Sequence, residues 1–313
     1  DYHETMEEYA KAKEKLFAMV SKNKNSVSAV NLNMELAENF LKYEAGEKYG
    51  YAVKISNFKF QISNQFKNKN FKKVFAENIE LGIQNTKYQI QNTNFKINLP
   101  GEFNVENALA ATCVGLSQDI SLEKISAALS KIKGVPGRME RIKNDQGIEI
   151  IVDYAVTPDS LEKLYGFISE FAKRSDRAAK EESGRTAKII AVFGSCGERD
   201  RGKRPIMGEI VARHADFAIV TNEDPYREDP TRIINEVFSG VVGGNITSAI
   251  PNFQFPISNF QTISNDKISK LKTEGENAFR ILDRREAIKT ALRIAKPGDI
   301  VIVTGKGAEE IMA

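Results

Sequence analysis

The second half of the chain alternates short apolar runs with helical segments, and this alternation restricts the fold more than any other feature. The apolar runs are IEIIVD (148–153), KIIAVFG (188–194), FAIVTN (217–222) and DIVIVTG (299–305). Helical periodicity predicts helices at 158–172, 205–214, 229–240 and 283–295. Short β-rich runs separated by helices pair as parallel strands through right-handed crossovers. The sequence therefore predicts a mostly parallel α/β sheet.

The first half of the chain has a different organisation. Residues 4–20 place apolar side chains at helical spacing, with Glu early and Lys late, and predict a helix. Residues 51–99 alternate Asn, Lys and Gln with Phe and Ile. This period of two predicts an antiparallel set of strands with one wet face. Two further helices are predicted at 104–116 and 121–132.

Chain length and a Gly-Pro-Gly break divide the chain into two parts. At roughly 150 residues per domain, 313 residues predict about two domains. We place the boundary at the break at 134–137, between residues 1–135 and residues 136–313. Residues 244–278 interrupt the second alternation, and their NFQFPISNFQ repeats the composition of NFKFQISNQF at 57–66. We expect this stretch to be a poorly ordered surface insertion.

The charge balance and the cysteine content exclude several classes of protein. Lys and Arg number 45 against 42 Asp and Glu, so the net charge of +3 gives no general attraction for nucleic acid. Two cysteines cannot form a disulfide framework, and their scarcity favours a reducing, cytoplasmic location. The apolar runs are far shorter than the roughly 20 residues that cross a bilayer. Because residue 1 is Asp and opens almost directly into a helical pattern, we expect the chain to begin inside a longer protein.

Loops that follow the predicted strands are the candidates for a site, because ligands of such sheets bind where the strands end. These loops are DYAVTP, GSCGERDRGKRP, TNEDPYRED and GKGAEE. Gly197 to Lys203 reads G-x-x-x-x-G-K, but a P-loop needs Ser or Thr next, where this chain has Arg204. No G-x-G-x-x-G follows a predicted strand, which disfavours nicotinamide chemistry. The charged loop therefore suits recognition by side chains better than a backbone cradle for phosphate.

Opposite charges in these loops suit an amino acid substrate. Arg199 can pair with a carboxylate, and Glu223 or Asp224 can pair with an ammonium group. In the tail, Gly305 lets the backbone approach a ligand closely, and Glu309 is a second acceptor for an ammonium group. A solvated turn is the alternative interpretation of the arginine-rich loop.

Other polar residues have structural explanations. Asp229 followed by Pro230 predicts a helix N-cap and the first helical residue. His214 lies at a predicted helix end, where C-terminal capping is favoured over catalysis. Because His3 and His214 are the only histidines, Ser-His-Asp and three-histidine metal chemistry are disfavoured.

Seven segments in a fixed order carry a resemblance to a known family. They are DYHETMEEYAKAKEKLF, LPGEFNVENALAA, KGVPGRMERI, VDYAVTPDSLEK, VFGSCGERDRGKRPIMGEIVARHAD, TNEDPYREDP and DIVIVTGKGAEE. Together they resemble the Mur ligases, above all the branch that adds the third residue of the peptidoglycan stem peptide to UDP-N-acetylmuramoyl-dipeptide. The resemblance covers both ends of the chain and most of the sequence between them.

This resemblance implies a domain organisation. Residues 1–135 would be part of the family's central ATP-binding domain. Residues 136–313 would be its Rossmann-like, amino-acid-binding C-terminal domain, with the insertion at about 244–278. The family's N-terminal UDP-sugar domain and its P-loop are missing, so we expect an N-terminally truncated ligase that is inactive alone.

The resemblance also implies a reaction. In the family, MgATP phosphorylates a substrate carboxylate, and an incoming amine then attacks the acyl phosphate to form an amide. The implied cofactors are ATP and Mg²⁺. The implied partners are UDP-N-acetylmuramoyl-dipeptide and a free diamino acid, with no nucleic acid and no membrane insertion, and we expect a monomer.

Single residues receive roles from the family's motifs. Lys13 matches the lysine that becomes carbamylated and helps hold magnesium, although by itself it would be a surface lysine. The nucleotide-side positions match Asn104, Asn107, Arg138 and Asp153. Positions around the incoming amino acid match Arg199, Asp224, Tyr226, Gly305 and Glu309. Without the resemblance, the two asparagines are plausible helix-start residues and Asp153 a turn residue.

Three positions depart from the family's pattern. The family usually has His where this chain has Val156 and Ala308, so polar contacts are lost at two loops. Members that add meso-diaminopimelate carry D-N-P-R where this chain has Glu-Asp-Pro-Tyr, and Tyr226 removes the bidentate partner for a second carboxylate. We therefore favour lysine or another diamino acid over diaminopimelate.

Two alternatives remain at this stage. One is another Mur-type ligase, such as a folylpolyglutamate or cyanophycin synthetase, against which the strings GERDRGKRP and GRMER argue. The other is a noncatalytic Mur-like scaffold, supported by the lost histidines and the absent P-loop. An upstream G-T-x-G-K-T segment in the same reading frame favours the ligase over the scaffold.

Overall fold

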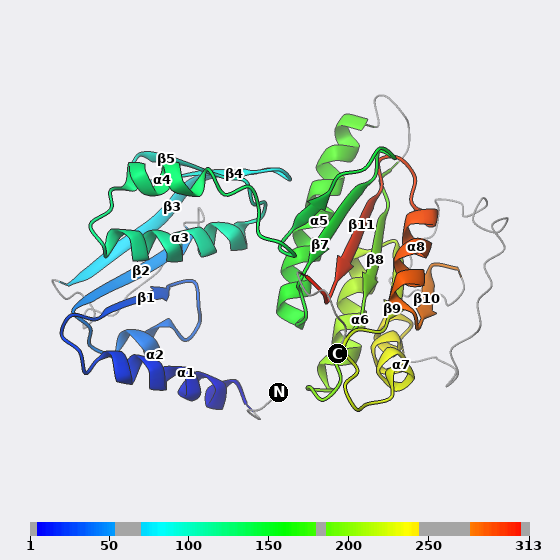
Figure 1. The fold of residues 1–313 in the computed structure, drawn as a ribbon, viewed down its shortest axis with the longest axis horizontal. Coiled ribbons are helices and arrows are strands. Elements are labelled where there is room, and N and C mark those ends of the chain that lie inside the picture. The colour runs from blue at the N-terminus through cyan, green and yellow to red at the C-terminus, as the bar shows by residue number, and fades with distance from the viewer. Residues whose placement is uncertain (1–4, 54–69, 180–185, 244–275, 308–313) are drawn as a thin grey trace. The chain divides into compact units, whose positions relative to one another are not determined.

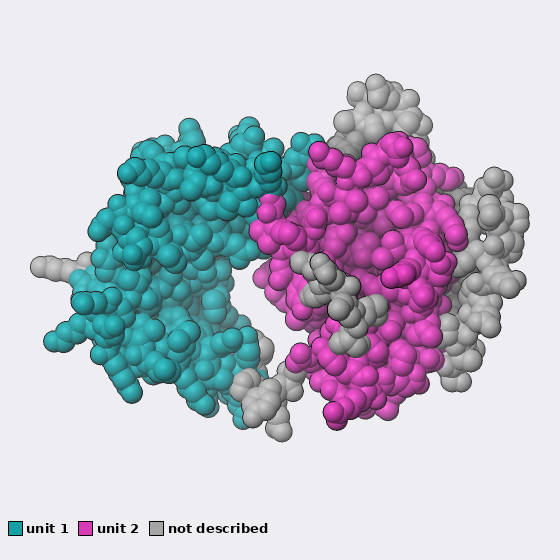
Figure 2. Space-filling view, viewed as in Figure 1, with its two compact units in different colours: residues 1–133 teal, residues 134–313 magenta. Residues whose placement is uncertain are grey.

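The computed structural model describes residues 5–53, 70–179, 186–243 and 276–307. The chain divides into two compact units, residues 1–133 and residues 134–313 (Figure 2). Each unit is a mixed α/β structure built on a sheet with parallel strands (Figure 1). Most of the expected insertion at 244–278 lies outside the described residues, as does Glu309. Within the described ranges, no helix is long and apolar enough to cross a membrane.

The first unit is a five-stranded sheet with the order β1-β2-β3-β4-β5. Its elements are α1 (Met6–Val20), β1 (Val27–Asn31), α2 (Ala37–Leu41), β2 (Glu47–Val53), β3 (Phe71–Leu81), β4 (Thr86–Ile90), β5 (Thr93–Ile97), α3 (Glu102–Leu116) and α4 (Leu122–Leu129). Thr5 caps α1 by accepting a hydrogen bond from the backbone N–H of Glu8. Gln91 and Asn92, with φ of 47° and 66°, form the two-residue turn that joins β4 to β5.

The expectation of a wholly antiparallel set at 51–99 is wrong. Only β3, β4 and β5 pair antiparallel, whereas β2 pairs in parallel with both β1 and β3. The reason is burial: β2 contributes Tyr49 and Val53 to the core beneath α3 and Ala52 to the core beneath α2, so both of its faces are covered. Strands covered on both faces are typical of parallel sheets, while β4 and β5 keep the alternation of a half-exposed pair.

The second unit is a six-stranded sheet with the order β10-β9-β8-β11-β7-β6. Its elements are β6 (Glu140–Ile142), β7 (Glu149–Asp153), α5 (Pro158–Ala179), β8 (Ile189–Phe193), α6 (Lys203–His214), β9 (Phe217–Thr221), α7 (Pro230–Val241), β10 (Ala278–Ile281), α8 (Arg284–Ile294) and β11 (Ile300–Thr304). All neighbouring pairs are parallel except β6 with β7. The predicted mostly parallel sheet is confirmed.

Most predicted helices of this unit end within a few residues of the observed ones. The exception is α5, which continues past residue 172 to Ala179, because Lys, Arg and Ala favour a helix without supplying an apolar face. Asp229 caps α7 through a hydrogen bond from Thr231 N–H, with Pro230 as the first helical residue, as predicted. The edge strands β6 and β10 were not predicted, since each is only a few residues long.

Buried Asp299 holds the starts of two central strands in register. Its Oδ1 accepts from the backbone N–H of Lys188, just before β8, and its Oδ2 from that of Lys296, before β11, each at 2.8 Å. The side chain is only 1% exposed. The carboxylate therefore satisfies two backbone donors that are partly removed from water.

We expect Asp299→Ala to lower the free energy of unfolding by about 2–4 kcal/mol, because it leaves these two donors without their acceptor. Urea unfolding of the full chain measures the change. The comparison is Asp283→Ala, which removes the N-cap of α8 and should cost about 1 kcal/mol. Equal losses in the two variants would contradict the role assigned to Asp299.

Candidate functional site

The carboxyl ends of β7, β11, β8 and β9 lie at one edge of the second sheet. β11 pairs with both β7 and β8, and β8 pairs with β9. Parallel pairing brings the residues that follow these strands to the same edge. We refer to residues 194–202 as the β8 loop, 222–229 as the β9 loop and 305–307 as the β11 loop.

Buried Glu223 contacts residues of both other loops. Cys196 Sγ of the β8 loop donates to Glu223 Oε1 at 2.9 Å. Gly305 of the β11 loop has φ of 99°, and a Cβ at this position would overlap Glu223 Oε2. Glu223 is 1% exposed, and burial raises the pKa of its carboxyl group. The three loops therefore meet around a carboxyl group that does not reach the solvent.

Asp224 joins the same loops at their outer side. Lys306 Nζ of the β11 loop lies 2.7 Å from Asp224 Oδ2. The backbone N–H of Gly197 in the β8 loop donates to the Asp224 carbonyl oxygen at 2.7 Å. The predicted ammonium acceptor thus contacts an ammonium group of the chain itself. Lys306 was not predicted as a site residue, although it lies between two glycines of the GKGAEE loop.

A buried arginine connects the β8 loop to the β9 loop. Arg204, in the first turn of α6, is fully buried and donates to both carboxylate oxygens of Glu228 at 3.0 and 3.1 Å. It also donates to the Cys196 carbonyl at 3.1 Å and to Glu236 of α7 at 2.5 Å. Hydrogen bonds from Arg204 and from the Glu198 N–H lower the pKa of Glu228 to about 2. We call Arg201, Arg204, Glu228, Arg232 and Glu236 the Arg204 cluster.

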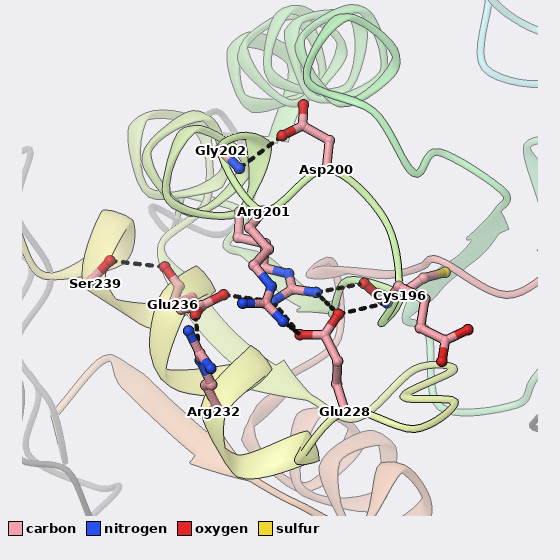
Figure 3. A network of polar contacts seen from close by, with 10 residues as sticks. Cys196, Asp200, Arg201, Gly202, Glu228, Arg232, Glu236 and Ser239 are labelled. Carbon is pink, nitrogen blue, oxygen red and sulfur yellow. Dashed lines mark hydrogen bonds and ion pairs between the residues drawn. The ribbon is translucent and has the colours of Figure 1, made fainter. Parts of the chain in front are cut away.

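Figure 3 shows the other members of the Arg204 cluster reaching the same carboxylates. Arg201 of the β8 loop pairs with Glu228 at 3.0 Å, and Arg232 of α7 pairs with Glu236 at 2.9 Å. The sequence alone assigned Arg204 only a negative role, as the residue that rules out a P-loop. A run of arginines facing a loop with acidic residues was the signal that could have revealed the cluster.

The predicted amino-acid-side residues are only partly brought together. Asp224 and Gly305 lie in the group around Glu223 and Lys306, whereas Arg199 and Tyr226 are exposed on the β8 and β9 loops. Glu309 lies outside the described residues. The two loops with exposed side chains are nonetheless joined, through the Gly197 hydrogen bond to Asp224.

The nucleotide-side candidates of this unit lie at two neighbouring strands: Asp153 ends β7, and Arg138 lies just before β6, which pairs with β7. Both carboxylate oxygens of Asp153 accept backbone N–H groups, from Met139 at 2.8 Å and from Ala155 at 2.9 Å. Burial raises the pKa of Asp153 against the effect of these hydrogen bonds. Exposed Arg138 lies over the Tyr154 ring, with its guanidinium carbon 4.6 Å from the ring centroid. Asp153 therefore makes the hydrogen bonds of a turn residue, and Arg138 presents a positive charge beside it.

In the first unit the candidates are Lys13, Asn104 and Asn107. Lys13 is exposed on α1, with Nζ 5.3 Å from the centroid of the Tyr9 ring. Buried Asn104, at the start of α3, donates to the Pro100 carbonyl at 2.7 Å and accepts from Asn107 Nδ2 at 3.3 Å. Among the described residues, no group of three or more His, Cys, Asp or Glu side chains is arranged to hold a metal ion.

The predicted capping role of His214 is wrong. Its ring contacts two side chains of α5, with Nε2 3.0 Å from Glu162 Oε1 and Nδ1 3.2 Å from Ser169 Oγ. The ring therefore joins α6 to α5 instead of capping its own helix.

Both units of the chain match models of known protein families. The family model described as "Mur ligase, glutamate ligase domain" matches residues 137–307, and the one described as "Mur ligase middle domain" matches residues 1–115. A UDP-N-acetylmuramoyl-L-alanyl-D-glutamate–2,6-diaminopimelate ligase of Syntrophomonas wolfei is 31% identical over 99% of this chain and 52% of its own length. A UDP-N-acetylmuramyl-tripeptide synthetase of Roseiflexus is 33% identical over 99% of this chain and 53% of its own length. The chain spans about half the length of these relatives.

Solved structures support the fold. A pseudomurein peptide ligase type C from Methanothermus fervidus matches with a TM-score of 0.58 and 18% identity, over 96% of this chain and 57% of that one. A D-alanyl-D-alanyl-adding UDP-N-acetylmuramoyl peptide ligase from Acinetobacter baumannii matches with a TM-score of 0.57 and 14% identity, over 95% of this chain and 51% of that one. At these identities the likeness concerns the fold alone.

The buried carboxyl group of Glu223 predicts a pH dependence of stability. Its pKa in the folded chain is raised above the ordinary 4.5, so the folded state binds the proton more tightly than the unfolded state. Stability should therefore fall as the pH rises from 4.5 through the raised pKa. Glu223→Gln should remove this dependence while keeping the acceptor for Cys196, as measured by thermal unfolding across pH.

Glu228→Gln provides the comparison with the opposite sign. Because the pKa of Glu228 is lowered to about 2, its stabilisation is present above the ordinary 4.5 and is lost as the pH falls toward 2. The Glu228→Gln variant should therefore lose stability at neutral pH and approach the parent chain in acid. An unchanged pH profile in Glu223→Gln would contradict the assignment for the buried carboxyl group.

Proposed function

Since the chain belongs to the Mur ligase family, whose members are ATP-dependent ligases, we propose that the protein containing it forms an amide bond in peptidoglycan synthesis. It joins the third amino acid to UDP-N-acetylmuramoyl-L-Ala-D-Glu. The incoming amino acid is a free diamino acid. The names of the relatives in Syntrophomonas and Roseiflexus describe ligation at the same step of the stem peptide.

The observation that carries this proposal is the meeting of the β8, β9 and β11 loops. Asp224 Oδ2 lies 2.7 Å from the ammonium group of Lys306, which supports a position suited to a cation. Arg199 is exposed on the adjoining β8 loop and suits a carboxylate. Arg199 can bind the carboxylate of a free amino acid, and Asp224 on the adjoining loop can bind its ammonium group.

The proposed chemistry has two steps. An oxygen of the dipeptide carboxylate attacks the γ-phosphorus of ATP, and ADP leaves. The amine nitrogen of the incoming amino acid then attacks the carbonyl carbon of the acyl phosphate, phosphate leaves, and the nitrogen loses a proton. No side chain acts as a nucleophile, so the residues act by positioning and by neutralising charge.

On the amino acid side, we assign Asp224 to the ammonium group and Arg199 to the α-carboxylate. Gly305 allows the backbone to approach the ligand, and Tyr226 borders its side chain. Glu309 is a second proposed acceptor for ammonium. Tyr226, in place of an arginine, favours lysine over diaminopimelate because a second carboxylate would lack a bidentate partner.

On the nucleotide side, we assign Arg138 to phosphate and Asp153 to the ribose hydroxyls. Each oxygen of Asp153 accepts one backbone N–H in the structure, and a carboxylate oxygen can accept a second hydrogen bond. The Asn104 side chain holds Asn107 at the start of α3, where both asparagines would contact the nucleotide. ATP is the proposed cofactor, since Mur ligases generally depend on it.

Magnesium is generally needed by the family, where it neutralises phosphate charge. Lys13 is the proposed metal-side residue through a carbamate formed with CO₂. The described residues lack a cluster of three or more His, Cys, Asp or Glu suited to a metal, so we assign no step to an ion held by them. Exposure of Lys13 supports its access to CO₂.

The two units are proposed to bind different substrates. We propose that residues 1–135 are part of the central ATP-binding domain and residues 136–313 the amino-acid-binding domain, with the insertion at about 244–278. The matches to the middle domain at 1–115 and to the glutamate ligase domain at 137–307 support this division. We further propose a cytoplasmic monomer.

The test is ADP release by the longest natural protein that contains this chain. With UDP-N-acetylmuramoyl-dipeptide present, release should depend on an added diamino acid, and lysine should be preferred over meso-diaminopimelate. A reaction without the dipeptide is the control. Preference for diaminopimelate would contradict the role of Tyr226, and release with folate and glutamate instead would contradict the proposed substrates.

Lys13 is tested in the same protein. Lys13→Arg retains the positive charge but cannot form the carbamate, so we expect it to reduce ADP release by about a hundredfold or more, in the range of lost charge-positioning groups. Removal of bicarbonate and CO₂ should reduce the activity of the parent protein and not that of the variant. Lys15→Arg, on the same helix, is the matched control and should keep its activity.

A further inference from the structure

Two residues other than glycine have left-handed backbone conformations in the loops of the candidate site. Glu198 of the β8 loop has φ of 51°, and Tyr226 of the β9 loop has φ of 49°. Residues other than Gly, Asn and Asp rarely adopt this backbone conformation. They keep it only where the surrounding structure holds them in it. Residues in this state often belong to binding sites, so the contacts that hold them point to a function.

Both left-handed residues lie beside the exposed side chains of the amino acid site. Arg199 directly follows Glu198, so the backbone at Glu198 sets the direction of the Arg199 side chain. Tyr226 is itself a proposed site residue and is 46% exposed. The two unusual turns therefore decide where a positive group and an aromatic group meet the solvent.

The two turns are held against each other through the backbone. Gly197 N–H donates to the Asp224 carbonyl at 2.7 Å, and Glu198 N–H donates to Glu228 Oε1 at 2.5 Å. A Cβ at Gly197 would overlap the Pro225 carbonyl oxygen, so the chains approach more closely than side chains allow. Glu228 thus accepts a hydrogen bond from the backbone N–H of Glu198, which is itself one of the two left-handed residues.

Arg204 fixes the groups that hold these turns. Its guanidinium donates to both oxygens of Glu228 and to the Cys196 carbonyl, which lies just before Gly197. One planar group therefore binds the beginning of the first turn and the carboxylate that accepts from its left-handed residue. Lysine has no planar fork and cannot make these bonds together.

We propose that Arg204 and Glu228 are positioning residues for the incoming amino acid. They hold the β8 and β9 loops in the conformation that presents Arg199 and Tyr226 to this substrate, without contacting it. The inference rests on the proposed function of the site. It goes beyond that function by naming the contacts that fix the two loops and thereby set the affinity of the site for the incoming amino acid.

The test compares Arg204→Lys and Glu228→Gln in the longest natural protein that contains this chain. Each variant should raise the KM for the amino acid at least about tenfold, since small displacements of positioning groups have effects of this size. The KM for ATP and for the UDP-linked dipeptide should stay within about twofold. Equal changes in all three KM values, or a fall in kcat alone, would overturn the proposal.

Arg213→Met is the matched control. Arg213 lies in the same helix, α6, and pairs with Glu162 at 2.7 Å. Both side chains are more than two-fifths exposed. Its loss removes an arginine ion pair from α6 while the two loops keep their contacts. The variant should keep all three KM values. A tenfold rise in its amino acid KM would overturn the proposal, because the effect would then follow from any ion pair of this helix.

Glu198→Gly provides a rescue that a purely stabilising role does not predict. Glycine adopts a positive φ without strain, so the turn should need the Arg204 cluster less. Added to Arg204→Lys, it should lower the amino acid KM again by several-fold. Added alone, it should leave this KM near that of the parent. If the double variant matches Arg204→Lys, the proposal is overturned.

Amide hydrogen exchange separates this inference from the proposed function. In the chain described here, Arg204→Lys should speed exchange at Gly197 and Glu198 by about tenfold or more and leave the amides of α8 unchanged. If the parent protein releases no ADP with any diamino acid, the proposed function fails, while faster exchange at these amides still supports the role of Arg204 in the loops. Unchanged exchange at these two amides overturns that role. If Arg204→Lys does not fold, the same measurements on Glu228→Gln decide.

Discussion

The position of β11 between β7 and β8 is the constraint on which the second unit depends. β11 is the last described strand in the chain, yet Val303 lies opposite Val152 on one side and Val192 on the other. Gly305 and Lys306 thereby lie beside the β9 loop, which precedes them in the chain by about 80 residues: Lys306 pairs with Asp224, 82 residues earlier. If β11 did not lie between β7 and β8, Lys306 would not reach Asp224 of the β9 loop.

The candidate site contains two buried ionisable groups whose environments differ. Arg204 donates to two carboxylates and to a backbone carbonyl, so the cost of removing its charge from water is offset by these hydrogen bonds. Glu223 receives one hydrogen bond from a thiol, and burial raises its pKa instead. The first arrangement fixes geometry between loops, whereas the second leaves a carboxyl group that binds its proton more firmly.

The first unit contributes a different kind of surface. Its asparagines lie in the first turns of α3, where the side chains of Asn104 and Asn107 are hydrogen-bonded to each other. The chain matches Mur ligase models in both units but spans about half the length of its relatives. In the proposed function, the first unit binds the nucleotide and the second binds the amino acid, so catalysis would depend on positioning.

The sequence by itself determined much of the local structure and the edge of the sheet at which the candidate loops lie. Apolar runs alternating with helices determined the parallel sheet, Asp229-Pro230 determined the start of α7, and the positions of the strands made the loops that follow them the candidate site. These features depend on residues close together in the chain. The parallel pairing of β2 and the ring contacts of His214 with α5 were missed, because partners distant in sequence decide them.

Tertiary structure alone decided which charges meet. Nothing local to GERDRGKRP distinguishes Arg199, which is exposed, from Arg204, which is fully buried against Glu228 and Glu236. Nor could the sequence pair Lys306 with Asp224 or Cys196 with Glu223. The physical reason is that burial and the distance between charges are properties of the packed chain, and they decide whether a charged residue binds a ligand or another part of the protein.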